Sequence, residues 1–280
     1  MPNLELRRKE RLSAFRRIAL GTWRTVGDPS VYGTLTVEVD AALAYVEAYR
    51  AATGRRLTLT HLMAKAMAEV FREMPDANAI LRWNRIYLRE QISIFFQVAL
   101  EDEAGDVDLS GVLVEDADRK DVAAIIDEFE RKVGAVRTGE DRALEKTRQS
   151  FKKLPFVLLR PFLDLVGFLS YGLNLDLRAL GMPKDAFGSA CVTNIGSLGI
   201  DEAYVPLIPY ARTTLLIAMG AVHAEPVVEG DQIVIRRRMR LNATFDHRVL
   251  DGAHCVVMSR VIRRCFAEPE RYFGPIPGGS

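Results

Sequence analysis

The stretch LNATFDHRVLDGAHC, residues 241–255, places a histidine and an aspartate four residues apart, directly before a glycine. Polar and apolar residues alternate up to Asp246, which predicts a strand with His247 at its end. The residues after Asp251 have helical spacing, so Asp251 is expected at a helix N-terminus, where it can cap free backbone N–H groups. An imidazole held at the end of a strand could act as a general base. On this short motif alone, a buried histidine beside a turn aspartate is the favoured interpretation.

The sequence on either side of this stretch predicts an α+β protein. Alternating or β-branched runs predict strands at 31–40, 190–199 and 212–222, one or two strands over 85–102, and a hairpin over 225–247 with its turn at 229–231. Amphipathic spacing predicts helices at 4–24, 41–54, 58–75, 118–137 and 252–266. Strands and helices in this succession predict a mixed β-sheet with helices packed against it.

The composition is that of an ordinary globular protein, with 49% hydrophobic and 27% charged residues. Lysine and arginine total 38 against 37 aspartates and glutamates, so the net charge is +1. No global basic field points to a nucleic-acid partner. The basic runs 7–17 and 236–240 are interpreted as a solvated helix face and a strand end.

The cysteines and the remaining histidines are interpreted as structural. Cys191, Cys255 and Cys265 lack the spacing of a metal site, so we expect reduced packing residues and no bound metal. The N-terminus is charged and lacks the apolar core of a signal peptide, and we therefore expect a cytoplasmic protein. Two further histidines, His61 and His254, are read as packing or surface residues, and His223 as part of a turn after a strand.

Several other stretches, in a fixed order, change the interpretation of His247. They are TLTVEVD (34–40), GRRLTLTHLMAKAMAEVFREMPDANA (54–79), EDADRKDVAAIIDEFERKVGAVR (115–137), CVTNIGSLG (191–199) and PLIPYARTTLLIAMGAV (206–222), followed by DHRVLDG (246–252). Together they resemble the catalytic domain of the dihydrolipoyl acyltransferase components of 2-oxoacid dehydrogenase complexes, a family that shares its fold with chloramphenicol acetyltransferase. The resemblance covers residues 7–272 except roughly 140–185. It implies a two-layer α+β fold with a mixed sheet flanked by helices, forming a single catalytic domain over residues 1–280 with an apolar insertion at about 145–185.

The resemblance also implies roles for individual residues. The family's histidine takes the proton from the thiol of coenzyme A or dihydrolipoamide as the sulfur attacks a thioester, and the matching residue is His247. A strand hydroxyl stabilises the oxyanion, and here Thr193 stands in place of the usual serine, with the same donor but a restricted rotamer. Asn194 is expected to support the strand and the wall of the substrate site. Asp251 matches an aspartate that pairs with an arginine near the N-terminus, for which Arg17 is the best match.

The family's assembly implies a homotrimer at least, with the active site between subunits and with larger cubic cores known. Coenzyme A is the implied substrate. No lipoyl or peripheral subunit-binding domain is recognised before residue 7, so a separate lipoyl-carrying or acyl-carrier protein is an expected partner. The stretch DVDLSGVLVEDAD (106–118) replaces the family's usual G-L-I-V-P-V-I strand. These departures keep a second interpretation open, in which the chain is a non-catalytic or weakly active oligomeric scaffold.

The strongly apolar segment LPFVLLRPFLDLVGFLSYGLNLDL, residues 154–177, has no counterpart in the family pattern. It is long enough to span a bilayer, since roughly 20 residues suffice. Arg160 and Asp164 would then lie in hydrocarbon at a cost on the order of 3 kcal/mol each, and Pro155 and Pro161 argue against an uninterrupted helix. We therefore expect a helix buried in the core or at a subunit contact. A monotopic membrane contact, or an apolar wall around a long acyl chain, are the alternatives.

Overall fold

The computed structural model describes residues 2–8, 29–101, 107–138 and 155–278. Its large sheet has the strand order β2-β9-β8-β7-β5-β6. The bounds are Ser30–Glu38 for β2, Ile94–Glu101 for β5, Val107–Val114 for β6, Ala190–Asn194 for β7, Leu215–Glu229 for β8 and Gln232–Asp246 for β9. The pairs β5/β7 and β7/β8 are parallel and the other pairs are antiparallel, so the predicted mixed sheet is confirmed.

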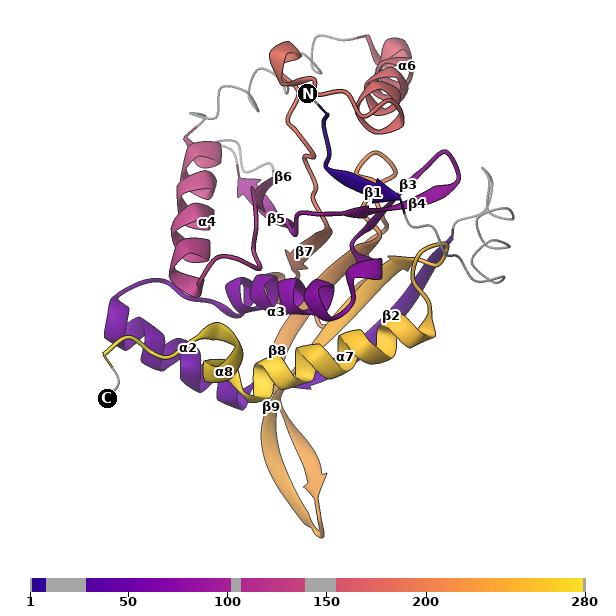
Figure 1. The fold of residues 1–280 in the computed structure, drawn as a ribbon. Coiled ribbons are helices and arrows are strands. Elements are labelled where there is room, and N and C mark those ends of the chain that lie inside the picture. The colour runs from indigo at the N-terminus through magenta and orange to yellow at the C-terminus, as the bar shows by residue number, and fades with distance from the viewer. Residues whose placement is uncertain (1, 9–28, 102–106, 139–154, 279–280) are drawn as a thin grey trace.

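The strands β8 and β9 form a long hairpin whose turn lies where the sequence predicts it. Glu229 pairs with Gln232, and Gly230 between them has a φ of 59°, a left-handed conformation that glycine adopts without strain. Toward its tip the hairpin leaves the body of the sheet and projects from the molecule (Figure 1). His223 lies within β8, opposite Arg238 of β9. The prediction that His223 follows a strand is therefore wrong, because the strand continues beyond the apolar run that signals it.

Five helices cover one face of the large sheet (Figure 1). They are α2 (Asp40–Thr53), α3 (Leu59–Glu73), α4 (Val122–Arg137), α7 (Gly252–Ala267) and the short α8 (Pro269–Phe273). The helix α2 ends as predicted at Gly54, whose φ of 71° provides a left-handed C-cap. Asp121 caps α4 by accepting a hydrogen bond from the backbone N–H of Ala124.

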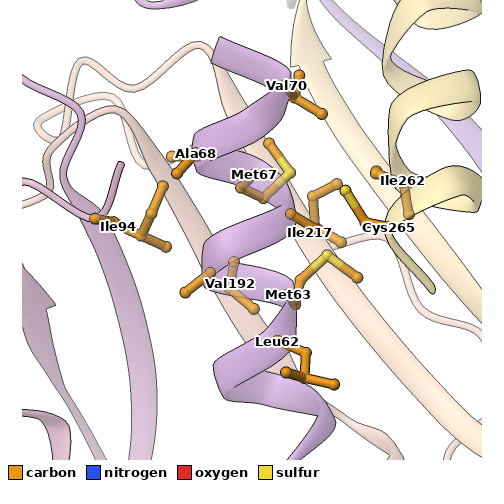
Figure 2. Close-up of a cluster of buried hydrophobic side chains, with 14 of the residues drawn as sticks. Leu62, Met63, Met67, Ala68, Val70, Ile94, Val192, Ile217, Ile262 and Cys265 are labelled. Atoms are coloured by element: carbon orange, nitrogen blue, oxygen red, sulfur yellow. The ribbon is translucent and has the colours of Figure 1, made fainter. Parts of the chain in front are cut away.

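The hydrophobic core lies between this sheet face and the helices. The central helix α3 buries a wide apolar face because it packs between the sheet and α7, while Lys65, Glu69 and Arg72 lie along its polar side. Figure 2 shows Met63 and Met67 of α3 between Val192 and Ile217 of the sheet and Ile262 and Cys265 of α7. These side chains are almost completely removed from solvent, so the core fixes how the strands and α7 lie relative to each other.

A second, antiparallel sheet pairs β1 (Leu6–Arg8) with β4 (Arg85–Arg89) and β4 with β3 (Ala79–Arg82). The helix predicted over 4–24 is therefore wrong at Leu6–Arg8. A three-residue strand has no periodicity of its own, and its conformation comes from pairing with β4, about eighty residues away. The rest of that predicted helix lies outside the described residues.

The apolar segment forms helix α6 (Phe156–Gly167), which continues into a π-helical turn, Phe168–Gly172. The helix runs through Pro161, so the expected interruption there is absent from this described stretch. Of the two expected placements, burial in the core is wrong, since Leu158 and Leu165 are 51% and 55% exposed, and a subunit contact stays a prediction because the structure contains one chain. Among the helices that the structure describes, none combines the length and the apolarity needed to cross a bilayer.

Candidate functional site

His247 lies directly after the last residue of β9, as the sequence predicts. Its backbone N–H donates to the carbonyl of Pro29 at 2.8 Å, which ties the turn to the residue before β2. Its Nδ1 lies 2.8 Å from the carbonyl oxygen of Leu250. A carbonyl oxygen can only accept, so Nδ1 carries a hydrogen and the neutral ring has its lone pair on Nε2. The turn thus prepares His247 to act as a base through Nε2.

Asp246 and Arg248, on either side of His247, form an ion pair that was not predicted from the sequence. Arg248 contacts both carboxylate oxygens of Asp246 through Nε and Nη2, and its backbone N–H donates to the same carboxylate. The backbone carbonyl of Asp246 also accepts from the N–H groups of Val249 and Leu250. Asp246 is buried while the Arg248 side chain is 29% exposed, so this bidentate pair is partly shielded from solvent and holds the turn that carries His247. The D-x-R spacing around the histidine was the available signal.

Asp251 caps helix α7, as expected. Its side chain accepts from the backbone N–H groups of Ala253 and His254, at 3.0 and 3.4 Å. The Nδ1 of His254 lies 2.7 Å from the carboxylate and 3.3 Å from the backbone nitrogen of Asp251. One ring nitrogen cannot donate to the first and accept from the second, and the shorter contact favours donation to the carboxylate. His254 is thus a partner of Asp251, while Arg17, the partner implied by the family pattern, lies outside the described residues.

Thr193 and Asn194 stand at the end of β7. Thr193 is buried and lies on the sheet face opposite the helices, because its neighbour Val192 belongs to the core. Asn194 is exposed. Its amide nitrogen donates to the hydroxyl of Thr60 at 3.0 Å, and its amide oxygen accepts from the backbone N–H of Ser197 at 3.1 Å. Asn194 therefore links the end of β7 to the start of α3 and to the loop that follows.

The strand register keeps Thr193 and His247 apart within one chain. Thr193 is opposite Ala218 of β8, which is opposite Asn242 of β9. His247 lies five residues beyond Asn242, which corresponds to roughly 16 Å along the strand, and Thr193 is two strands to the side. The structure of the single chain therefore does not bring the predicted base and the predicted hydroxyl into one site.

A cavity of about 310 Å³ lies elsewhere, between α7 and the helix-covered face of the sheet. Its walls include Leu35, Phe245, Cys255 and Met258, and it contains neither His247 nor Thr193. Burial, with a smaller contribution from the Asp251 carboxylate, raises the pKa of the Cys255 thiol, which favours its unreactive protonated form. Burial raises the pKa of Cys191 to about 12. Both thiols behave as the packing residues that the sequence predicts.

Among the described residues, no three His, Cys, Asp or Glu side chains gather in a way that could hold a metal ion. The candidate site therefore consists of two parts: the turn from Asp246 to Asp251 with its histidine, and the end of β7 with Thr193 and Asn194. The assignments of His247, Asp251, Thr193 and Asn194 to catalysis or binding remain predictions.

The sequence of the chain is similar to those of a known protein family. The family model "2-oxoacid dehydrogenases acyltransferase (catalytic domain)" matches residues 12–152 and 183–274. A curated relative, the dihydrolipoyllysine-residue acetyltransferase component of the acetoin cleaving system of Bacillus subtilis, is 23% identical over 217 residues, which are 77% of this chain and 43% of the relative. The chain thus spans less than half the length of this relative and of the branched-chain lipoamide acyltransferase of the same organism.

Solved structures agree with the fold. The dihydrolipoamide acetyltransferase of Azotobacter vinelandii superposes with a TM-score of 0.63 at 18% identity, over 94% of this chain and 93% of that one. The cubic core of a pyruvate dehydrogenase multienzyme complex gives a TM-score of 0.63 at 17% identity, over 94% and 93% of the two chains. At such identities the likeness establishes the shared α+β fold. The family match covers well over half of the chain, and the protein therefore belongs to the family of 2-oxoacid dehydrogenase acyltransferase catalytic domains.

Proposed function

We propose that the protein transfers an acyl group between coenzyme A and a dihydrolipoamide-like thiol, with His247 as the general base. The observation that carries the proposal is the 2.8 Å contact from Nδ1 of His247 to the carbonyl oxygen of Leu250. This contact places the lone pair of the neutral ring on Nε2, which is the state that a base requires. The ion pair of Asp246 and Arg248 and the cap formed by Asp251 keep the turn in that geometry.

The reaction follows from this arrangement. Nε2 of His247 takes the proton of the attacking thiol while the sulfur forms a bond to the thioester carbonyl carbon. The tetrahedral intermediate that results carries its negative charge on the former carbonyl oxygen. Its collapse breaks the original carbon–sulfur bond, and the imidazolium returns the proton to the departing thiolate. One thioester is exchanged for another, so the enzyme needs to position the thiol and stabilise the oxyanion.

The oxyanion donor is proposed to be Thr193 from a second copy of the chain. The hydroxyl of Thr193 lies at the end of β7, but it is far from His247 of its own chain because of the strand register. A site built from two subunits resolves this separation, and Asn194 would form its wall. The similarity to a chain that forms a cubic core supports an assembly based on trimers.

The Azotobacter relative supports the choice of residues. Its crystallographic and enzymatic study concerns the catalytic role of a serine, a histidine and an asparagine four positions after the histidine. Here threonine stands for the serine, and Asp251 lies four positions after His247. An aspartate cannot donate a hydrogen bond when ionised, so we assign Asp251 to capping α7 and ordering the turn. The acyl acceptor is a free dihydrolipoyl group or one carried by a lipoyl-bearing partner protein.

The test is turnover of acyl-coenzyme A thioesters, from short to long, with dihydrolipoamide as acceptor. We expect thiol release by the wild-type protein and a loss of about two to four orders of magnitude in His247→Ala. His223→Ala is the control for loss of an imidazole, because His223 is exposed and its ring contacts the carboxylate of Asp201 rather than the turn that carries His247, and it should retain most of the activity. Turnover by His247→Ala equal to wild type, or none by a folded wild-type trimer, would support the scaffold interpretation instead.

A further inference from the structure

Helix α6 carries an exposed apolar stripe. Leu158, Pro161, Leu165 and Phe168 follow one another at intervals of three or four residues, so they share one face of the helix. Leu158, Leu165 and Phe168 are 51%, 55% and 45% exposed, whereas Val166 on the opposite side is buried. Three such side chains in one row are an unusual amount of apolar surface for a helix to leave in water.

A tryptophan extends the stripe. Trp83 lies at the tip of the turn between β3 and β4, where it and Asn84 both have a positive φ, and it is 59% exposed. Its ring stands perpendicular to that of Phe168 with the centroids 5.8 Å apart, and its Nε1 donates to the carbonyl of Gly172 at 2.9 Å. We call these five residues, Leu158, Pro161, Leu165, Phe168 and Trp83, the α6 patch. Tryptophan is enriched where proteins meet the boundary between lipid headgroups and acyl chains.

The charges around the α6 patch are mostly positive. Arg160 is exposed on α6, and Arg82 and Arg85 flank Trp83 on either side of the turn. In the described residues of α6 and of the 82–85 turn, Asp164 is the one acidic residue beside these three arginines in the sequence. Apolar side chains bordered by arginine and tryptophan are typical of segments that lie on an anionic lipid surface.

The position of the α6 patch leaves it accessible. The helix α6 lies at one end of the molecule, beyond the small sheet and opposite the projecting β8–β9 hairpin (Figure 1). The family model matches neither α6 nor the turn after it, since the match stops at residue 152 and resumes at 183. The α6 part of the patch therefore lies outside the span that the family model matches, whereas Trp83 lies inside it.

We propose that the α6 patch docks the protein on an anionic lipid bilayer, with α6 lying in the plane of the headgroups. A helix of 12 residues spans about 18 Å, which is too short to cross a bilayer but sufficient to bury one face in its surface. A second copy of the chain is a poorer occupant, because pairing two such patches would bring arginines against arginines. The proposal stands apart from the proposed acyl transfer, since docking requires neither His247 nor Thr193.

The experiment measures co-sedimentation of the full-length protein with vesicles. Vesicles of mixed phosphatidylcholine and phosphatidylglycerol should bind the protein, vesicles of phosphatidylcholine alone should bind it more weakly, and added salt should reduce the difference. Leu165→Asp should weaken binding by at least about tenfold, because it places a charge on the helix face that enters the bilayer surface. Gly134→Asp is the matched control: it adds the same charge on helix α4, outside the patch, where nothing lies within 4 Å of the added β-carbon, and this variant should bind like wild type.

A second readout follows Trp83 directly. The chain has two tryptophans, so Trp23→Phe leaves Trp83 as the fluorophore, and its emission should shift to shorter wavelength when the mixed vesicles are added. Equal sedimentation of wild type and Leu165→Asp, or no shift of Trp83 emission, would overturn the proposal. A change in subunit number in Leu165→Asp, with vesicle binding unaltered, would instead identify the patch as a contact between copies. Circular dichroism establishes that each variant is folded.

Discussion

Two histidines occupy the same local position with different electrostatic consequences. His61 and His254 are each the third residue of a helix, and each places Nδ1 against the side chain that caps it. His61 faces the hydroxyl of Thr58 at 3.0 Å, whereas His254 faces the carboxylate of Asp251 at 2.7 Å. Burial, helped by the charges of Arg56 and Arg50, lowers the pKa of His61 to about 4.

This lowered pKa predicts a loss of stability in mild acid. The unfolded chain protonates His61 near pH 6.5, whereas the folded chain protonates it only near pH 4. The free energy of unfolding therefore falls as pH decreases from 6.5 to 4. The full effect is about 3 kcal/mol. His61→Gln retains the capping box but does not titrate, and urea unfolding from pH 7 to 4 should show a shallower decline than in wild type. Parallel declines in the two proteins would contradict the assignment.

The cap formed by Asp251 can be separated from its charge. Asparagine caps helices as well as aspartate, while alanine cannot. Asp251→Ala should therefore lower the free energy of unfolding by about 1 kcal/mol and reduce turnover by about tenfold or more, because the turn that carries Leu250 and His247 loses its anchor. Asp251→Asn should keep most of the stability and most of the turnover. Thermal unfolding and kcat/KM measured together check this, and an asparagine variant as impaired as the alanine variant would show that the carboxylate charge itself is required.

At the scale of elements, the end of β7 depends on two glycines. A β-carbon on Gly220 would overlap the carbonyl oxygen of Asp201, and one on Gly196 would overlap the carbonyl oxygen of Gly220. Gly220 lies in the bulge between Met219 and Val222 of β8. These close backbone contacts hold the loop after Asn194 against β8, next to the end of the strand that carries Thr193.

Gly220→Ala should therefore destabilise the protein by about 1–3 kcal/mol, since the loop or the bulge must move. That corresponds to a fall in Tm of several degrees, at about 2–4 °C per kcal/mol. Gly134→Ala is the matched control, because nothing lies within 4 Å of its added β-carbon and alanine favours the helix α4. Differential scanning calorimetry of both variants tests this, and a Gly220→Ala protein as stable as the control would show that the loop is not held as described.

Which elements the sequence predicts depends on where their stabilising interactions come from. Helices such as α2 and α4, and the β8–β9 turn, are encoded locally by spacing, caps and glycine, and they lie where predicted. The strand Leu6–Arg8 and the exposure of α6 depend on what distant segments offer as partners, which local pattern does not record. The position of His247 at a strand end was predictable, but its separation from Thr193 was not, because that follows from long-range register.

At the scale of the whole molecule, this separation predicts that the active site exists only in the assembly. A monomer would hold His247 and Thr193 in two incomplete sites, so activity should fall as the trimer dissociates. The projecting β8–β9 hairpin is consistent with such an assembly. Val228, Ile233 and Ile235 near its tip are 71–76% exposed, and they lie on one face of a two-stranded ribbon that would be only marginally stable in isolation.

Mixing two inactive variants tests the shared site. His247→Ala and Thr193→Ala should each be nearly inactive as pure proteins. When they are unfolded together in equal amounts and refolded, a subunit with intact His247 will meet a neighbour with intact Thr193 in some interfaces. Random assembly gives about a quarter of the sites both groups, so about a quarter of wild-type activity should return. Refolding each variant separately before mixing is the control and should restore none. A co-refolded mixture that remains inactive would place both residues in a site within one chain, whereas full activity of Thr193→Ala alone would remove Thr193 from the reaction.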